Sequence, residues 1–183
     1  METQVRSKER RPAEAECQFV IVCDTREQLS YKFQDLRSDA KDGNRPISVR
    51  ITRGTLHQGD YSLLGFETQI AIERKSLEDL FSTLGPGRHR FHRELERLAA
   101  MPHAEVIVEA EWSVVLADPP ERSRLPPKTV FRSVIAWRER FPTVGWWFVP
   151  SRRMGEIVTF RRLERFWKSQ GRKSQGKSQG LAQ

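Results

Sequence analysis

The stretch IAIERKSLEDL, residues 70–80, delivers an acid and two bases to one short segment of the chain. Three apolar residues run directly into Glu73, Arg74 and Lys75, and a helix is predicted to begin just after them. In an extended strand, side chains two residues apart share a face. Glu73 and Lys75 are therefore expected to point to one side of a buried strand, and Arg74 to the other.

The segment GDYSLLGFETQIAIERK, residues 59–75, is typical of a β-hairpin with Gly65 near its turn. Pairing of its two strands brings Asp60 close to Glu73. Two carboxylates at a sheet edge, beside the ammonium of Lys75, would hold a divalent cation, Mg²⁺ or Mn²⁺, because hard cations prefer carboxylate oxygens. The simpler alternative is an exposed Glu and Lys that merely close a strand.

An acidic turn precedes this hairpin. FVIVC, residues 19–23, is a continuous apolar run, which indicates a strand covered on both faces. DTREQ, residues 24–28, follows directly, so Asp24 is expected at the carboxyl edge of that strand, where sites on open α/β sheets gather. Glu27 follows one short turn later. The alternative is a polar turn that only ends the strand.

Strands and helices alternate along the rest of the chain. Period-two alternation and short apolar runs predict strands, and apolar residues at helical spacing predict helices. Ser76 and Asp79 form a predicted capping box at the start of the first helix. Strands are expected at 47–56, 104–110 and 144–149, and helices at 76–84, 88–101, 129–141 and 154–168. This order predicts one α/β domain over residues 17–168, with a mixed central β-sheet flanked by α-helices.

Both ends of the chain have a different composition from this domain. Residues 1–16 carry four basic and four acidic residues with little to bury, which predicts a disordered arm. Residues 169–183 continue a repeated KSQG unit and are predicted to form a flexible basic tail. Such a tail either attracts phosphates or only increases solubility, and composition does not choose between the two.

The overall charge favours a polyanionic partner. The 183 residues carry a net charge of +8, and 31% of them are charged, so DNA is the expected partner. No run approaches the roughly 18 apolar residues that span a bilayer, and the N-terminus lacks the apolar core of a secretory signal. The only cysteines are Cys17 and Cys23, too few for a disulfide scaffold. We therefore expect an intracellular protein, in the cytoplasm or nucleoid of a prokaryote or the nucleus of a eukaryote, without a membrane partner.

The helix predicted after the hairpin is rich in arginine. Its candidates for contacts with DNA phosphates are Arg88, Arg90, Arg93 and Arg97. Contacts of this kind position a duplex without reading its sequence. The alternative is a solvated helix in which these arginines pair with the glutamates at positions 94 and 96.

These pieces together resemble one family. A Gly-Asp pair, a short hairpin, Glu-Arg-Lys and then Asp79 after three residues resemble the signature of XPF-type structure-specific endonucleases. VIVCDTREQ, residues 20–28, looks like that family's first strand and acidic turn. RFHRELERL, residues 90–98, is similar to its arginine-rich helix. The resemblance covers residues 18–166 and rests on four pieces in the right order.

The resemblance implies a restriction-endonuclease-like fold and a metal-dependent hydrolysis of phosphodiester bonds in branched, flap or fork DNA, in DNA repair or recombination. It implies that Mg²⁺ or Mn²⁺ is held by Asp60 and Glu73, with Asp24 as a further acidic ligand. Lys75 would be the catalytic lysine. Arg74 belongs to the same catalytic motif, and either reaches a phosphate or braces the carboxylates from behind.

Two further positions of the motif, Glu27 and Asp79, would support these residues. Asp79 would orient Arg74 or Lys75, although its place in the first turn of a helix already gives it a structural task.

Members of this family usually carry a C-terminal helix-hairpin-helix module and often work as dimers, so a homodimer or a partner protein is also implied. Nothing after residue 168 has the apolar content for such a module. One alternative function is a catalytically silent DNA-binding scaffold of the same fold, against which the intact set of Asp60, Glu73 and Lys75 argues. Another is a nuclease of the wider restriction-like group that acts on simple duplex DNA.

Overall fold

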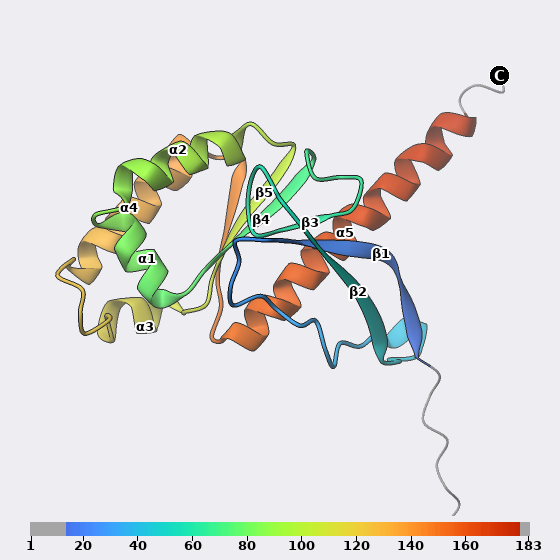
Figure 1. The fold of residues 1–183 in the computed structure, drawn as a ribbon, viewed down its shortest axis with the longest axis horizontal. Helices are drawn as coiled ribbons and strands as arrows, with labels where there is room; N and C mark the ends of the chain where they lie inside the picture. Colours follow the sequence, from blue (N-terminus) through green and yellow to red (C-terminus); the bar gives the residue numbers. More distant parts are fainter. Residues whose placement is uncertain (1–13, 180–183) are drawn as a thin grey trace, which may run out of the picture.

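The computed structural model describes residues 14–179, with side chains described as far as residue 171. A six-stranded sheet in the order β2-β1-β3-β4-β5-β6 forms its centre (Figure 1). The strands are β1 (Ala15–Asp24), β2 (Ile47–Gly54), β3 (Tyr61–Leu63), β4 (Ile70–Lys75), β5 (His103–Val108) and β6 (Val144–Phe148). The predicted α/β class with a mixed central sheet is thereby confirmed.

One strand runs against the other five. β1 is parallel to β2, β3 is antiparallel to both β1 and β4, and β4, β5 and β6 are mutually parallel. The carboxyl ends of β1, β4 and β5 and the beginning of β3 therefore lie at the same edge of the sheet. The predicted hairpin of β3 and β4 is confirmed, and it brings the acidic segments of the sequence to this edge.

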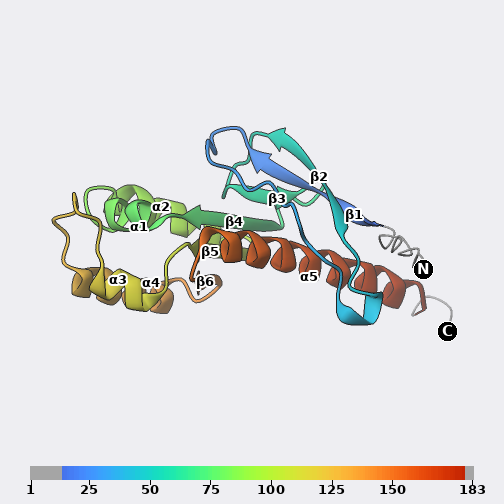
Figure 2. The same cartoon turned by 90° about the horizontal axis from the view of Figure 1, so that it is seen from below.

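Helices cover both faces of the sheet (Figures 1 and 2). The helices α1 (Leu77–Leu84), α2 (Arg88–Ala99) and α4 (Pro127–Arg140) pack on one face of β4–β6, and α5 (Arg152–Gln179) crosses the other face. Two short elements were not predicted from the sequence: the 3-10 helix η1 (Ala40–Asp42) and the helix α3 (Trp112–Ala117).

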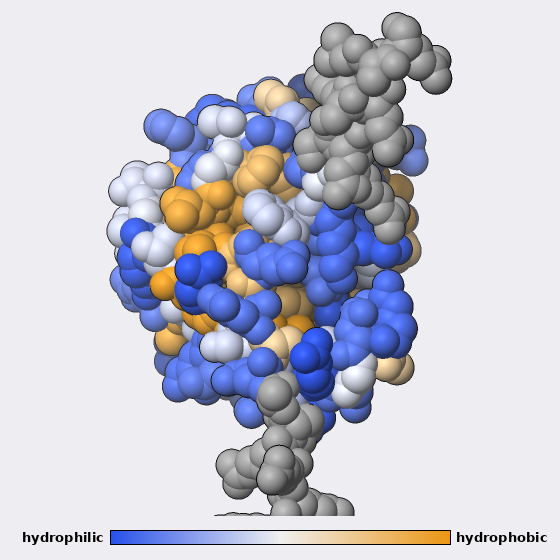
Figure 3. Space-filling model, turned by 90° about the vertical axis from the view of Figure 1, so that its right-hand side faces the viewer, coloured by the Kyte–Doolittle hydropathy of each residue, from blue (hydrophilic) through white to orange (hydrophobic). Residues whose placement is uncertain are grey.

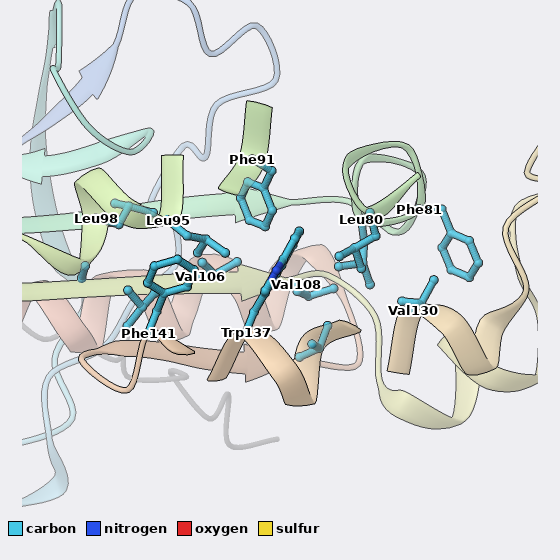
Figure 4. Packing of buried hydrophobic residues seen from close by; sticks show 14 of the residues in the cluster. Leu80, Phe81, Phe91, Leu95, Leu98, Val106, Val108, Val130, Trp137 and Phe141 are labelled. Carbon is cyan, nitrogen blue, oxygen red and sulfur yellow. The ribbon is translucent and has the colours of Figure 1, made fainter. Parts of the chain in front are cut away.

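The strand β4 separates two hydrophobic cores. Ala71 packs with α1, α2 and α4, whereas Ile70 and Ile72 pack with α5, as the alternation of the sequence predicts. Phe91 of α2 and Trp137 of α4 meet over the first of these cores, with their ring centroids 5.4 Å apart (Figure 4). All six residues of β4 are buried, so its charged end is held by packing on both sides.

One strand and one helix extend past the boundaries predicted for the domain. β1 begins at Ala15, inside the predicted arm, because Ala15 pairs with Ile47 of β2. α5 continues to Gln179, so it includes residues 169–179 of the predicted tail. A helix that is already anchored by packing extends without a new nucleation step, and Lys, Arg and Gln are good helix formers. The rest of the predicted arm and tail, residues 1–13 and 180–183, lies outside the described residues.

The end of the molecule formed by β1, β2 and α5 carries apolar surface within a hydrophilic border (Figure 3). A hollow of about 270 Å³ lies at this end, and its lining includes Cys17, Phe19, Phe160 and Trp167. None of these residues belongs to the charged edge described below. Of the helices in the part of the chain that the structure describes, not one combines the length and apolar character that crossing a bilayer requires.

Candidate active site

Asp60 is fixed between β1 and β4 by its backbone. Its N–H donates to the carbonyl of Ile72 (2.8 Å), and its carbonyl accepts from the N–H of Asp24 (2.8 Å). The preceding Gly59 has φ +70°, and a Cβ there would lie 3.0 Å from the carbonyl oxygen of Ile72. Only glycine lets the chain turn this close to β4 without strain, and the turn places Asp60 opposite the end of that strand.

Glu73 and Lys75 lie together on the face of β4 that α2 covers. The ammonium of Lys75 donates to Oε1 of Glu73, and both side chains are buried. The same ammonium lies 4.6 Å from the centroid of the Phe91 ring on α2. The structure thus brings together Asp60, Glu73 and Lys75, the three residues that the sequence placed at the centre of the site.

The electrostatics of this group are those of carboxylates crowded in a low-dielectric setting. Burial, and next the charge of Glu73, raise the pKa of Asp60 to about 8. Burial also raises the pKa of Glu73, although the charge of Lys75 opposes this effect. Burial alone would lower the pKa of Lys75, but the neighbouring carboxylates, Glu73 first, outweigh it and raise that pKa. Lys75 is therefore held in its charged form, and the two carboxylates repel each other.

These residues fit a divalent cation in the manner of Mg²⁺. That ion keeps several waters and usually takes only one or two carboxylates from the protein, and Asp60 and Glu73 offer two whose repulsion a cation would relieve. Among the residues whose side chains are described, no group of three or more His, Cys, Asp or Glu is disposed to hold a metal ion. An all-protein cage of the kind that encloses a structural metal is therefore not formed there.

Asp24 lies at the predicted edge, but its carboxylate is already occupied. Oδ1 accepts from the backbone N–H of Arg26 (2.8 Å) and from its Nε (2.7 Å), and Oδ2 accepts from Nη2 of Arg26 (3.1 Å) and from the N–H of Leu56 (2.7 Å). Burial opposes the ionisation of Asp24, yet these hydrogen bonds outweigh it and lower its pKa. In this arrangement Asp24 orients Arg26, whose guanidinium is largely exposed and feels the charges of Asp60 and Glu73.

Arg74 points to the opposite face of β4, as its alternation predicts. Its Nε and Nη2 donate to the two carboxylate oxygens of Glu109, at 2.7 and 2.6 Å. Nη1 lies 3.7 Å from Oε1 of Glu27. The backbone N–H of Arg74 donates to Oδ2 of Asp60 (2.7 Å). The guanidinium of Arg74 therefore lies behind β4 with Glu109 and Glu27, and only its backbone N–H contacts Asp60.

Asp79 is occupied by the start of α1. Its N–H donates to Oγ of Ser76 (3.1 Å), and its Oδ2 accepts from the backbone N–H of Ser76 (3.4 Å), which completes the predicted capping box. Its carboxylate is exposed and contacts neither Arg74 nor Lys75 within the described part of the chain. The contacts of Asp79 therefore match its structural role as a helix cap. They do not show it orienting Arg74 or Lys75.

The four arginines of α2 divide between two flanks of the helix. Arg88 faces α4, where its Nη1 donates to Ser133 (2.7 Å) and its guanidinium lies over the Trp137 ring at 4.8 Å. Arg97 donates from Nε to Oε1 of Gln58 (3.0 Å), in the turn that carries Asp60.

Arg90 and Arg93 are exposed, and Arg90 lies seven residues before Arg97, two helical turns away on the same flank. This flank faces the site, whereas Arg88 links two helices. The alternative in which these arginines pair with Glu94 and Glu96 is not seen among the described residues, where Glu96 lies 3.5 Å from His92.

Several residues that shape the site were not assigned to it by sequence reasoning: Arg26, Gln58, Glu94 and Glu109. Glu109 directly follows an apolar strand, as Asp24 follows the run FVIVC. This position after a strand is the sequence signal that could have identified Glu109 as a site residue. The sequence predicts Glu94 only as a surface ion-pair partner, whereas its carboxyl lies within hydrogen-bonding range of Glu73. The side chains of Arg26 and Gln58 reach the site only through loops, for which sequence periodicity carries no signal.

Comparison with known proteins gives a consistent picture. The family model described as the ERCC4 domain matches residues 23–154. The fold is similar to that of XPF from Aeropyrum pernix, with a TM-score of 0.55 and 21% identity over 80% of this chain and 60% of that one. XPF from Aeropyrum pernix in complex with DNA gives a TM-score of 0.53 and 21% identity over 82% of this chain and 66% of that one. The chain thus spans less than two thirds of these solved structures, and no curated protein matches it.

Proposed function

Because this chain belongs to the ERCC4 domain family, we propose that it is a divalent-metal-dependent DNA endonuclease that hydrolyses phosphodiester bonds in branched, flap or fork DNA. The observation that carries the proposal is the convergence of Asp60, Glu73 and Lys75 at the sheet edge. Two crowded carboxylates and a charged lysine are the groups that metal-assisted phosphodiester hydrolysis requires. DNA repair or recombination is the corresponding setting.

Asp60 and Glu73 would hold Mg²⁺ or Mn²⁺. Bound there, such a cation supplies a Lewis acid that polarises the phosphodiester and activates water. The protein contributes rigid placement: the Asp60 backbone is tied to β1 and β4, and Glu73 is buried in the sheet. Fixed charges of this kind stabilise a transition state without reorganising during the reaction.

Lys75 would donate hydrogen bonds to the attacking water or to a phosphoryl oxygen on which negative charge develops. Its raised pKa keeps it protonated at neutral pH, so it acts as a donor and as a positive charge rather than as a general base. Arg26, exposed and oriented by Asp24, would contact a neighbouring phosphate. Fork-shaped donors such as the guanidinium of Arg26 match phosphate geometry.

The DNA would approach along the flank of α2 that faces the site. Arg90, Arg93 and Arg97 lie on this side, and phosphate contacts of this kind set the register of a duplex without reading its sequence. A solved structure of XPF from Aeropyrum pernix is a complex with DNA, which supports the choice of partner. A homodimer or a partner protein remains part of the proposal, because XPF-type nucleases often work as dimers.

A cleavage assay tests the proposal. Labelled duplex, flap, fork and four-way substrates are incubated with the protein in Mg²⁺, in Mn²⁺ and in EDTA. We expect cutting of the branched substrates with either metal and none in EDTA. Cutting that persists in EDTA would exclude the metal mechanism, and equal cutting of simple duplex would favour a nuclease without structure preference.

Matched variants locate the site in the same assay. Glu73→Gln and Lys75→Ala are expected to lower cleavage at least 100-fold while DNA affinity changes less than threefold. Glu78→Gln, an exposed acid on α1, is the control and should cut normally. Full activity in both site variants would place the chemistry elsewhere in the molecule.

One observation favours a second candidate, a catalytically silent DNA-binding scaffold. Lys75 donates a hydrogen bond to Glu73, and both carboxylate oxygens of Asp24 accept hydrogen bonds from protein donors. These carboxylates are therefore bonded to protein groups and not free for a cation. A protein that binds branched DNA tightly but cuts none of the substrates with either metal would match this candidate.

A further inference from the structure

Glu94 is a half-buried carboxylate on α2 that the mechanism above does not use. It follows Phe91 by three residues, so the two side chains lie on neighbouring positions of the helix surface. The Phe91 ring lies against the ammonium of Lys75, at 4.6 Å from its centroid. Glu94 is therefore placed beside the Glu73–Lys75 pair by the packing of α2 on β4.

Glu94 lies against one member of that pair, Glu73, and its charge acts on the other, Lys75. Its carboxyl lies within hydrogen-bonding range of Glu73, and its charge acts on Lys75 more strongly than that of any other residue except Glu73. One ammonium thus has two carboxylates available to it, one on β4 and one on α2. In the structure the ammonium bonds to the strand residue, Glu73.

This arrangement bears on how Glu73 becomes available to a cation. An oxygen that accepts from the Lys75 ammonium has to give up that bond before it binds a metal ion. A buried ammonium left without a partner is costly, and the Phe91 ring alone does not replace a carboxylate. Asp60 is a poorer substitute, because its Oδ2 already accepts from the N–H of Arg74 (2.7 Å).

We propose that Glu94 is a positioning residue that takes over the ammonium of Lys75 when Glu73 turns to a divalent cation. The exchange keeps Lys75 in place at the site throughout the cycle and removes the competition between Lys75 and the cation for Glu73. The inference rests on the proposed metal-dependent function. It adds to that function a way in which Glu73, one of the two metal ligands, is released from Lys75.

The test measures Mn²⁺ binding to the full chain by isothermal titration calorimetry, without DNA. Glu94→Gln keeps the shape of the side chain but cannot neutralise Lys75, so Mn²⁺ affinity is expected to fall about tenfold, the usual effect of losing a partner of a metal ligand. Glu96→Gln removes the same charge from the exposed side of α2 and is expected to stay within twofold. Glu94→Asp should lie between wild type and Glu94→Gln, and thermal unfolding checks that each variant folds.

A second background separates the exchange from direct ligation and from simple loss of charge. In Lys75→Met the ammonium is gone, so adding Glu94→Gln should change Mn²⁺ affinity by no more than about twofold. An undiminished tenfold loss in that background would overturn the proposal and make Glu94 a metal ligand itself. Equal affinity of Glu94→Gln and Glu96→Gln in the wild-type background would also overturn it.

The two levels of inference fail differently. Absence of Mn²⁺ binding to the wild-type protein would remove the metal-dependent function and the exchange with it. Normal Mn²⁺ binding with no effect of Glu94→Gln would remove the exchange alone.

Discussion

Arg74 and Glu109 form a two-pronged ion pair on the face of β4 opposite to Glu73 and Lys75, with N–O distances of 2.7 and 2.6 Å. The pair ties the end of β4 to the residue that directly follows β5. Because the backbone N–H of Arg74 also donates to Oδ2 of Asp60, the same residue holds the carboxylate of one of the candidate metal ligands. The ion pair on one face of β4 thus fixes the strand that carries Glu73 and Lys75 on its other face.

Breaking this pair is expected to destabilise the fold. Glu109→Ala leaves the buried guanidinium of Arg74 with only the more distant Glu27 (3.7 Å) to compensate its charge, which costs about 3 kcal/mol of unfolding free energy. Chemical denaturation measures the change, and Glu111→Ala, an exposed residue two positions on, should stay within about 0.5 kcal/mol. Replacing both partners, Arg74→Met with Glu109→Leu, should recover most of the loss. A double variant as unstable as Glu109→Ala would show that the pair does more than neutralise charge.

Asp60 is expected to make the stability of the metal-free protein depend on pH. Its pKa is raised from an ordinary value near 3.9 to about 8, so the folded state binds this proton more tightly than the unfolded state. The stability that follows is complete below about pH 4 and is lost as the pH rises to about 8.

In EDTA, Asp60→Asn should therefore gain stability relative to wild type as the pH is raised from 5 to 8.5. Its thermal midpoint at pH 8.5 is expected to exceed that of wild type by about 3 °C or more. Asp118→Asn, at an exposed position, should match wild type at both pH values. A constant difference between Asp60→Asn and wild type over this range would contradict the raised pKa.

The arginines of α2 should separate into those that bind DNA and those that hold the fold. Arg90→Gln with Arg93→Gln is expected to flatten the dependence of log affinity on log salt by up to about 1.8, or 0.9 for each phosphate that is no longer neutralised. Fluorescence anisotropy over a salt series measures this slope. The control pair is Arg132→Gln with Arg138→Gln on α4, which should leave the slope unchanged.

Arg88→Ala is expected to behave in the opposite way. It removes the bond to Ser133 and the stacking on Trp137, so it should lower the thermal midpoint while the salt slope stays the same. A reduced slope in Arg88→Ala would place this arginine on the DNA instead.

Gly59→Ala tests whether the close turn places Asp60. The positive φ costs about 1–2 kcal/mol for any residue with a Cβ, and at Gly59 the new Cβ also meets the backbone of Ile72 at 3.0 Å. Gly65→Ala is the matched control, because Gly65 has φ +83° and open space around it. Denaturation should show the larger loss for Gly59→Ala, and Mn²⁺ affinity should fall in that variant alone. Equal losses of stability and of Mn²⁺ affinity in the two variants would show that the turn at Gly59 does not specifically position Asp60.

Much of this arrangement could be predicted from the sequence because it is local. The alternation along residues 70–75 assigns Glu73 and Lys75 to one face and Arg74 to the other, since the period of a strand is fixed by backbone geometry. The capping box of Ser76 and Asp79 depends on residues three apart. The hairpin places Asp60 near Glu73, and this could also be predicted because the two paired strands are close in the sequence.

The partners of these residues were decided by the tertiary structure. Asp24 looked like a free carboxylate in the sequence, but its oxygens accept from Arg26 and from the N–H of Leu56, 32 residues away. Whether Arg74 reaches a phosphate or braces the strand from behind depended on Glu109. The order of the strands places Glu109 beside Arg74. Hydrogen-bond partners far apart in the sequence leave no periodic pattern, because they depend on which strands become neighbours.

By itself, then, the sequence determined which charged side chains share the edge of β4 and which family they resemble. The tertiary structure decided what each charge is paired with, and so which carboxylates stay available for a cation. The physical reason is that side-chain direction follows from the local backbone, whereas the state of a buried charge depends on every group packed around it. Glu94 illustrates this difference: it is an ordinary polar position on a helix in the sequence, and a neighbour of Glu73 and Lys75 only when α2 packs on the sheet.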